Sequence, residues 1–292
     1  PYTERHRPVV AGVSVGPTNY SLAGTIGLSL VYRNNQPGIL SNRHVLFPDW
    51  LNVSDKTWEG YLRRGARVRQ PSLLDGGTEG DYIAILEDVA PIDRTGLNQV
   101  DAEFASLLAV AAEAKYLAAS GQGVSFLQPY RALGTVQPGE KVYKNGRTSG
   151  GTQGEVIGVD ADVQVEYPGM GLVRFAGQLA TTGMLSPGDS GSALMKGDGI
   201  VVGLGFAGSP SASFANPIGT VFERLGLTLT PADSGKVPVA VGLVSIIPIL
   251  IRVWGYNNVT QAWLLYDPAH PQLSDLEYLT QGHGYWIKMS QS

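Results

Sequence analysis

Short apolar runs separated by turn-forming residues recur along this chain and restrict its fold more than any other feature. The 292 residues include 38 glycines and 18 prolines. Between them lie runs rich in Val, Ile, Thr and Tyr, which favour strands, whereas Gly, Pro, Asn and Asp favour the turns between strands. The pattern predicts a mostly β protein. Its length allows two domains, or a two-barrel domain with an appendage.

The composition excludes several classes of function. A formal net charge of -4 and the lack of a long basic run argue against nucleic-acid binding. There is no cysteine, so neither a disulfide framework nor a thiolate metal site is expected. The four histidines are scattered and none are spaced as His-x-x-x-His, so we expect no metal and no cofactor.

The most apolar stretch, residues 237–253, does not predict a membrane span. It is shorter than the roughly 20 residues of a membrane helix and contains Pro238 and Pro248. Two strands split by a turn are predicted instead. The chain begins Pro-Tyr-Thr-Glu, without the apolar core of a signal peptide. It is therefore cytoplasmic, or its leader has been removed; we expect the second, with the protein secreted or at the cell surface.

A serine between two glycines, Ser190, is a candidate nucleophile. Residues 187–194 read Pro-Gly-Asp-Ser-Gly-Ser-Ala-Leu. A serine hydroxyl attacks only if a base takes its proton and donors bind the resulting oxyanion. Gly188 lets the backbone turn so that the N–H groups of Gly188 and Ser190 point at one place, forming an oxyanion hole. A plain Gly/Ser turn between strands explains the same residues, so this segment alone leaves both interpretations open.

The position of one histidine favours the catalytic interpretation. His44 ends a predicted apolar strand over residues 38–44, where a buried strand could hold a rigid base. The other histidines lie in a charged N-terminal segment or in predicted loops: His6, His270 and His283. A core histidine with satisfied hydrogen bonds is the alternative for His44.

Four short motifs occur in the order found in chymotrypsin-fold serine peptidases. Residues 41–45, Ser-Asn-Arg-His-Val, and 188–192, Gly-Asp-Ser-Gly-Ser, resemble the segments that carry the catalytic histidine and serine. Residues 144–156 resemble a strand pair, and residues 221–225 the start of the C-terminal helix, of alpha-lytic and streptogrisin-like bacterial peptidases. Over roughly residues 8–228 the chain is similar to bacterial trypsin-like peptidases related to the plant narrow-leaf protease.

This resemblance implies a peptidase domain at residues 1–228, built from two six-stranded antiparallel Greek-key barrels of the chymotrypsin type. The expected parts are a first barrel at about 8–108, a second at about 131–218 and a closing helix at about 217–225. The alanine-rich segment 109–119 has good helix propensity and predicts a helical connection between the barrels.

Residues 229–236 are predicted to be a linker, and residues 237–292 a small β accessory domain. The domain resembles a repeat unit appended to many secreted bacterial proteins. It holds three of the five tryptophans. These aromatic residues either fill a core too small for aliphatic side chains alone or bind a glycan or partner, and we expect most of them to fill the core. The expected partner interaction of this domain is self-association or attachment to a surface.

The third member of a Ser-His-Asp triad orients the imidazole and stabilises its protonated form. Two aspartates that precede predicted strands fit this role. Counting strands favours Asp101, because the last strand of a six-stranded barrel would begin there. Asp81, after a glycine-rich loop, is the alternative.

The resemblance also suggests which residues bind substrate. The position six residues before the nucleophile lies at the base of the primary pocket in this fold, and here it is Met184. No carboxylate stands there to bind a basic side chain, so trypsin-like specificity is not expected. Residues 205–208 resemble the strand that pairs with the substrate backbone, which makes Phe206, Ala207 and Gly208 candidate binding residues. A medium-sized apolar side chain is the expected preference.

The resemblance therefore implies a serine endopeptidase that hydrolyses a protein or peptide through an acyl-enzyme, with His44, Asp101 and Ser190 as its triad. The alternative is a catalytically silent peptidase fold that serves as a binding or assembly protein on the cell surface.

Overall fold

The computed structural model describes residues 2–18, 21–47, 66–86, 92–119, 125–167, 171–197, 199–231, 236–238, 250–257, 262–270, 274, 276, 278–280 and 285–290. Strands dominate these residues, which confirms the predicted mostly β fold class. The chain divides into two compact units, Pro1–Leu229 and Thr230–Ser292. No helix within the described ranges is both long and apolar enough to cross a membrane.

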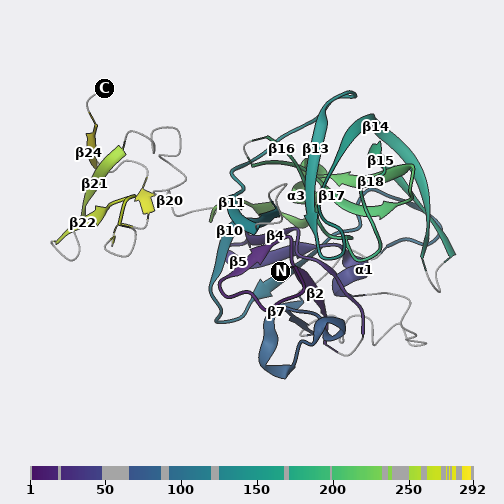
Figure 1. The fold of residues 1–292 in the computed structure, drawn as a ribbon, viewed down its shortest axis with the longest axis horizontal. Helices are drawn as coiled ribbons and strands as arrows, with labels where there is room; N and C mark the ends of the chain where they lie inside the picture. The colour runs from purple at the N-terminus through teal and green to yellow at the C-terminus, as the bar shows by residue number, and fades with distance from the viewer. Residues whose placement is uncertain are drawn as a thin grey trace. The chain divides into compact units, whose positions relative to one another are not determined.

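One eight-stranded sheet of the larger unit carries the histidine segment, and Figure 1 draws most of it in purple and blue. Its order is β19-β4-β5-β9-β7-β6-β2-β3. The strands are β2 (Ser14–Pro17), β3 (Gly24–Thr25), β4 (Leu28–Arg33), β5 (Gln36–Ser41), β6 (Arg67–Arg69), β7 (Tyr82–Leu86), β9 (Glu103–Leu107) and β19 (Leu227–Thr228). Asn34 and Asn35 connect β4 to β5 with φ of 50° and 64°, as a two-residue hairpin turn of type I′ requires.

The register of β5 and β9 decides which residues meet at the end of this sheet. The two strands are antiparallel, and Ser41 pairs with Glu103. The chain leaves β5 at the end where it enters β9. His44, just beyond one strand, therefore lies beside Asp101, just before the other.

The second eight-stranded sheet of the larger unit carries the serine segment, and Figure 1 draws most of it in teal and green. Its order is β12-β17-β16-β13-β14-β15-β18, and β8 pairs with β15. The strands are β8 (Leu97–Asn98), β12 (Ala132–Leu133), β13 (Lys141–Gly146), β14 (Gly150–Tyr167), β15 (Gly171–Thr182), β16 (Ala193–Lys196), β17 (Ile200–Gly208) and β18 (Ala212–Pro217). Because β17 also pairs with β18, six of these described strands, β13 to β18, close into a ring. The six-stranded count for the first barrel stays a prediction.

The helix expected over the alanine-rich segment 109–119 is wrong. Residues Ala112–Ala119 form strand β10, which pairs with β1 (Val9–Ala11) on one side and β11 (Ser125–Pro129) on the other. These two neighbours bond to the backbone of the segment, and Tyr116 and Leu117 are buried. Pairing with two strands and burial outweigh the helix propensity of the alanines, because tertiary contacts override such local preferences.

The closing helix, α3 (Ile218–Leu225), lies where the sequence predicts it. Its buried residues, Ile218, Val221, Phe222 and Leu225, recur at the spacing of one helix face. Gly226 ends the helix in the left-handed region, with φ of 62°.

The smaller unit contains a three-stranded sheet in the order β22-β21-β24 and a pair, β20-β23. The strands are β20 (Lys236–Pro238), β21 (Leu250–Asn257), β22 (Ala262–Tyr266), β23 (Tyr278–Thr280) and β24 (Tyr285–Met289). Val253 and Leu276 are its buried core residues among those described. Trp263 and Trp286 are 57% and 72% exposed, so the expectation that most of the aromatic residues fill the core is wrong for these two. The turn predicted within residues 239–249 lies outside the described residues.

Candidate active site

His44 lies in α1 (Arg43–Leu46), a single helical turn directly after β5. Its backbone N–H donates to Asp101 Oδ1 at 3.1 Å, and its Nδ1 is hydrogen-bonded to Asp101 Oδ2. The side-chain amide of Asn42 donates to the backbone carbonyl of Asp101 at 2.6 Å. The structure thus brings together His44 and one of the two aspartates considered from the sequence.

Asp101 is completely buried. Besides the two His44 groups, the hydroxyl of Tyr167 donates to its Oδ2 at 2.6 Å. Burial favours the neutral carboxyl, but the imidazole and the donated hydrogen bonds outweigh it and hold the pKa of Asp101 below its ordinary value. The carboxylate is therefore charged at neutral pH. The sequence analysis assigned no role to Tyr167.

Asp81 lies elsewhere, at the end of η2 (Glu79–Asp81). Its carboxylate accepts the Thr78 N–H at 2.9 Å and the Thr78 hydroxyl at 2.8 Å, and it pairs with Arg5 at 2.8 Å. Burial opposes its charge, but these partners lower the pKa of Asp81. Asp81 holds the N-terminal segment against the first sheet and, in the part of the chain described, makes no hydrogen bond to His44.

Ser190 and His44 line the same cleft, which has a volume of about 590 Å³. The loop that carries Ser190 connects β15 to β16. The other residues around the cleft are Leu22, Ala23, Val45, Gln164, Val165, Glu166, Tyr167, Leu185, Ser186, Pro187, Gly188, Phe206, Ala207, Gly208, Ser209 and Phe214. Apolar side chains from both strands and loops therefore surround the candidate nucleophile.

The backbone of the serine loop is held in a conformation that requires glycine. Gly188 has φ of 95°, and a Cβ there would lie 2.3 Å from the hydroxyl oxygen of Thr148. Thr25, on β3, donates its hydroxyl to the Gly188 carbonyl at 3.0 Å and its N–H to the Ser190 carbonyl at 2.8 Å. With both carbonyls held, the N–H groups of Gly188 and Ser190 donate to no other described residue.

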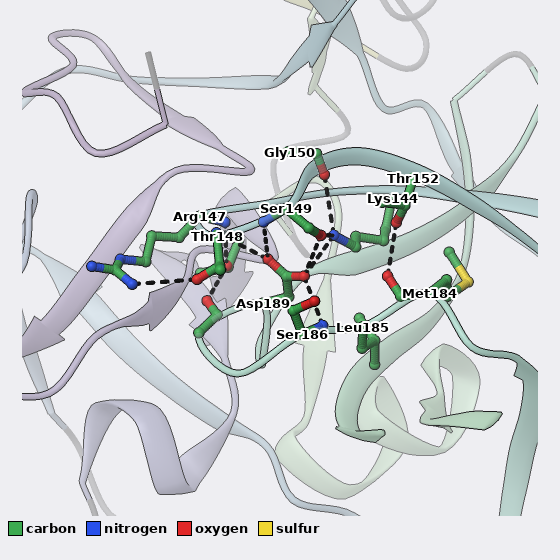
Figure 2. Close-up of polar contacts among 12 residues, drawn as sticks. Lys144, Arg147, Thr148, Ser149, Gly150, Thr152, Met184, Leu185, Ser186 and Asp189 are labelled. Carbon is green, nitrogen blue, oxygen red and sulfur yellow. Dashed lines mark hydrogen bonds and ion pairs between the residues drawn. The ribbon is translucent and has the colours of Figure 1, made fainter. Parts of the chain in front are cut away.

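Asp189, beside the candidate nucleophile, forms a second buried carboxylate site (Figure 2). Lys144 Nζ lies 2.8 Å from its Oδ2, and both side chains are completely buried. The backbone N–H groups of Thr148 and Ser149 donate to Oδ1 at 3.0 Å each, and that of Ser186 donates to Oδ2 at 2.9 Å. Burial opposes the charge, but the lysine and these hydrogen bonds lower the pKa of Asp189. The charged carboxylate ties the serine loop to the turn after β13.

The sequence analysis gave Lys144 no role, although strand alternation could have found it. Side chains two positions apart on a strand share a face. Val142 and Lys144 share the buried face of β13, whereas Lys141 and Tyr143 are exposed. A lysine on a buried face requires a charged or hydrogen-bonding partner.

Arg147, in the turn between β13 and β14, joins the same loop to the first sheet. Figure 2 shows its side chain pointing away from Asp189. Its Nε and Nη2 lie 2.8 and 2.5 Å from the carboxylate of Asp75, in η1 (Leu73–Asp75). Its backbone N–H donates at 2.9 Å to the Thr25 hydroxyl, which in turn binds the Gly188 carbonyl. The ion pair therefore links the first sheet to the serine loop, a role the sequence did not reveal.

The predicted substrate-binding residues are only partly brought together. Phe206, Ala207 and Gly208 line the cleft. Met184 does not, because its side chain packs in the buried cluster of the second sheet, and the neighbouring Leu185 lines the cleft instead. Among the described residues, no three His, Cys, Asp or Glu side chains are placed to hold a metal ion.

No protein-family model and no curated protein matches the sequence of this chain. Solved structures do match its fold. Thermobifida fusca protease A superposes with a TM-score of 0.54 at 18% identity, covering 77% of this chain and 99% of that one. A Cellulomonas bogoriensis chymotrypsin has a TM-score of 0.53 at 19% identity, with the same two coverages, 77% and 99%. An alpha-lytic protease homolog, N4, has a TM-score of 0.53 at 16% identity, covering 76% and 98%. The chain thus has the fold of bacterial chymotrypsin-like serine proteases, as the sequence motifs predict.

Proposed function

We propose that the protein is a serine endopeptidase in which His44, Asp101 and Ser190 form the triad. One observation carries the proposal: a single cleft holds an imidazole backed by a buried carboxylate and a serine on a glycine loop with two backbone donors. The fold shared with serine proteases supports the same proposal.

The reaction follows from these positions. Nδ1 of His44 faces Asp101, so Nε2 is the nitrogen that accepts the proton of Ser190 Oγ as the oxygen attacks a peptide carbonyl. The N–H groups of Gly188 and Ser190 bind the oxyanion. The imidazolium, stabilised by the Asp101 carboxylate, then protonates the leaving amine. A water molecule repeats the cycle on the acyl-enzyme and releases the acid.

The preferred substrate is a protein or peptide with an apolar side chain at the primary position. Leu185, Phe206 and Phe214 line the cleft close to the serine loop, and the lining carboxylate, Glu166, lies on the separate strand β14. Peptide substrates that differ only at the primary position test this preference. Faster cleavage after arginine or lysine than after leucine or valine would contradict it.

A fluorophosphonate probe, which reacts with activated serines, tests the catalytic proposal. We expect it to modify the wild type at Ser190, located by peptide mass spectrometry, and to leave Ser190→Ala unmodified. Ser192→Ala is the matched control, because that hydroxyl lies two residues further on but is completely buried, whereas Ser190 is only half-buried. A folded wild type that stays unmodified would overturn the peptidase proposal and favour a catalytically silent fold used for binding or assembly.

We propose secretion or cell-surface display as the setting, with residues 237–292 mediating self-association or attachment. The exposed side chains of Trp263 and Trp286 support an adhesive role. Sedimentation velocity of the full chain, compared with Trp263→Ser/Trp286→Ser, tests self-association. A distribution that is the same for both proteins would exclude self-association through these side chains.

A further inference from the structure

The hydroxyl of Tyr167 reaches the Asp101 carboxylate from the opposite sheet. Tyr167 is the last residue of β14, and its hydroxyl donates to Asp101 Oδ2 at 2.6 Å. The same oxygen is hydrogen-bonded to Nδ1 of His44. Because one carboxylate oxygen accepts both bonds, the orientation it presents to the imidazole depends on where the tyrosine hydroxyl lies.

The second sheet holds the tyrosine ring through strand pairing and aromatic packing. Tyr167 pairs with Gly171 across the β14–β15 hairpin, and its ring is buried with its centroid 6.0 Å from that of Phe175. Phe175 in turn packs against Phe206 at 4.9 Å. From this cluster the ring meets the imidazole of His44 edge-on, at 5.6 Å and an interplanar angle of 76°.

We propose that Tyr167 is a positioning residue for the reaction, an inference that rests on the proposed peptidase function. Its hydroxyl aligns Asp101 Oδ2 with Nδ1 of His44, and its ring confines the imidazole on the side of the cleft that β14 forms. The hydrogen-bonded pair comes from the first sheet and the tyrosine from the second, so Tyr167 makes the alignment of His44 depend on the docking of the two sheets.

Kinetics of Tyr167→Phe test the proposal, because phenylalanine keeps the ring and removes only the donor. The lost bond orients the Asp101–His44 pair and does not touch substrate, so we expect kcat to fall roughly 10- to 100-fold with KM nearly unchanged. Tyr130→Phe is the matched control: its buried hydroxyl bonds to the backbone of Leu30, away from the cleft, and its loss should leave kcat within about twofold.

The pH profile separates this role from a merely structural one. Within the described ranges, the titratable groups facing the Asp101 carboxylate are His44 on α1 and Tyr167 on β14, and Glu166 lines the adjoining cleft. Without the tyrosine donor, the negative charge of Asp101 is less dispersed and binds a protonated imidazole more strongly. The acidic limb of the kcat/KM profile is therefore expected to move to higher pH in Tyr167→Phe and to stay in place in Tyr130→Phe.

A measurement that needs no catalysis distinguishes failure of this inference from failure of the peptidase proposal. In a Ser190→Ala background, proton NMR follows the Nδ1–H resonance of His44 and the pH at which it titrates. We expect Tyr167→Phe to shift both and Tyr130→Phe to shift neither. Unchanged resonance and titration in Tyr167→Phe would overturn the positioning role, whether or not the wild-type protein cleaves peptides.

Discussion

The regions around Asp101 and Asp189 are each built on a buried carboxylate, but the two carboxylates have different roles. Both carboxylates are completely buried, and each accepts several hydrogen bonds that lower its pKa. Asp101 is paired with His44, which lines the open cleft, whereas Asp189 is paired with Lys144, whose side chain is completely buried.

The difference between the partners shows what each region can do. An imidazole at the cleft can gain and lose a proton while the carboxylate behind it stays charged. Burial lowers the pKa of Lys144, and the Asp189 carboxylate opposes that change. Because the lysine is sealed from solvent, its pair with Asp189 holds backbone and has no access to a substrate in the cleft. We infer that the region around Asp101 takes part in proton transfer and that the region around Asp189 maintains the shape of the serine loop.

The largest expected effect is on kcat and comes from the region around Asp101. Asp101→Asn removes the charge that orients His44, and in triad enzymes such a change lowers kcat about 10⁴-fold. The measurement is kcat on a peptide substrate together with the rate of fluorophosphonate labelling. Asp81→Asn is the control, since that carboxylate anchors the N-terminal segment. A greater loss of activity in Asp81→Asn than in Asp101→Asn would reverse the assignment.

The second largest effect is on folding stability and comes from the region around Asp189. Lys144→Met leaves Asp189 buried without its cation, and removing one partner of a buried pair costs about 3–5 kcal/mol of folding stability. Urea denaturation measures this loss. Lys196→Met should change stability by less than about 1 kcal/mol, because the Lys196 pair with Glu140 is far more exposed. Equal losses of stability in the two variants would show that the buried Lys144–Asp189 pair stabilises the fold no more than the exposed Lys196–Glu140 pair.

The dependence of stability on pH tests the Lys144–Asp189 pair further. The pKa of Asp189 is lower when folded than its ordinary value of 3.8, so its stabilisation is present above that value and lost as pH falls through the folded pKa. Lys144→Met removes a main cause of the lowering. Between about pH 5 and pH 2, urea midpoints of this variant should therefore fall less than those of the wild type. A parallel fall would show that the lysine does not lower the pKa.

The smallest effect concerns the link between the two regions. Arg147→Lys keeps the charge but loses the two-pronged contact with Asp75. Because the arginine is partly exposed, we expect a loss of about 1 kcal/mol in stability and a decrease of a few fold in kcat. Arg131→Gln, at an exposed position, serves as the control. If kcat is unchanged in Arg147→Lys, the ion pair does not support the serine loop.

Local features of the fold were predictable because they depend on neighbouring residues. The Asn34-Asn35 hairpin and the strand leading to His44 follow from residue preference and apolar runs, and the helix at Ile218–Leu225 was expected from the resemblance of residues 221–225 to a peptidase helix. Strand β10 was missed because its alanines favour a helix in isolation, whereas two neighbouring strands satisfy its backbone. Met184 was placed at the cleft by analogy of position, yet the second sheet buries it.

The sequence by itself determined the strand-rich architecture, the glycine-framed Ser190 and a histidine after a buried strand, since each of these depends on a few adjacent residues. Counting strands favoured Asp101 over Asp81, but both precede strands, so the sequence left Asp81 as an alternative. The tertiary structure decided, through the pairing of Ser41 with Glu103, which places Asp101 beside His44. It alone brought Tyr167 to that carboxylate and Lys144 to Asp189. Such contacts join residues 45 and 66 positions apart, and they form only when sheets close and dock.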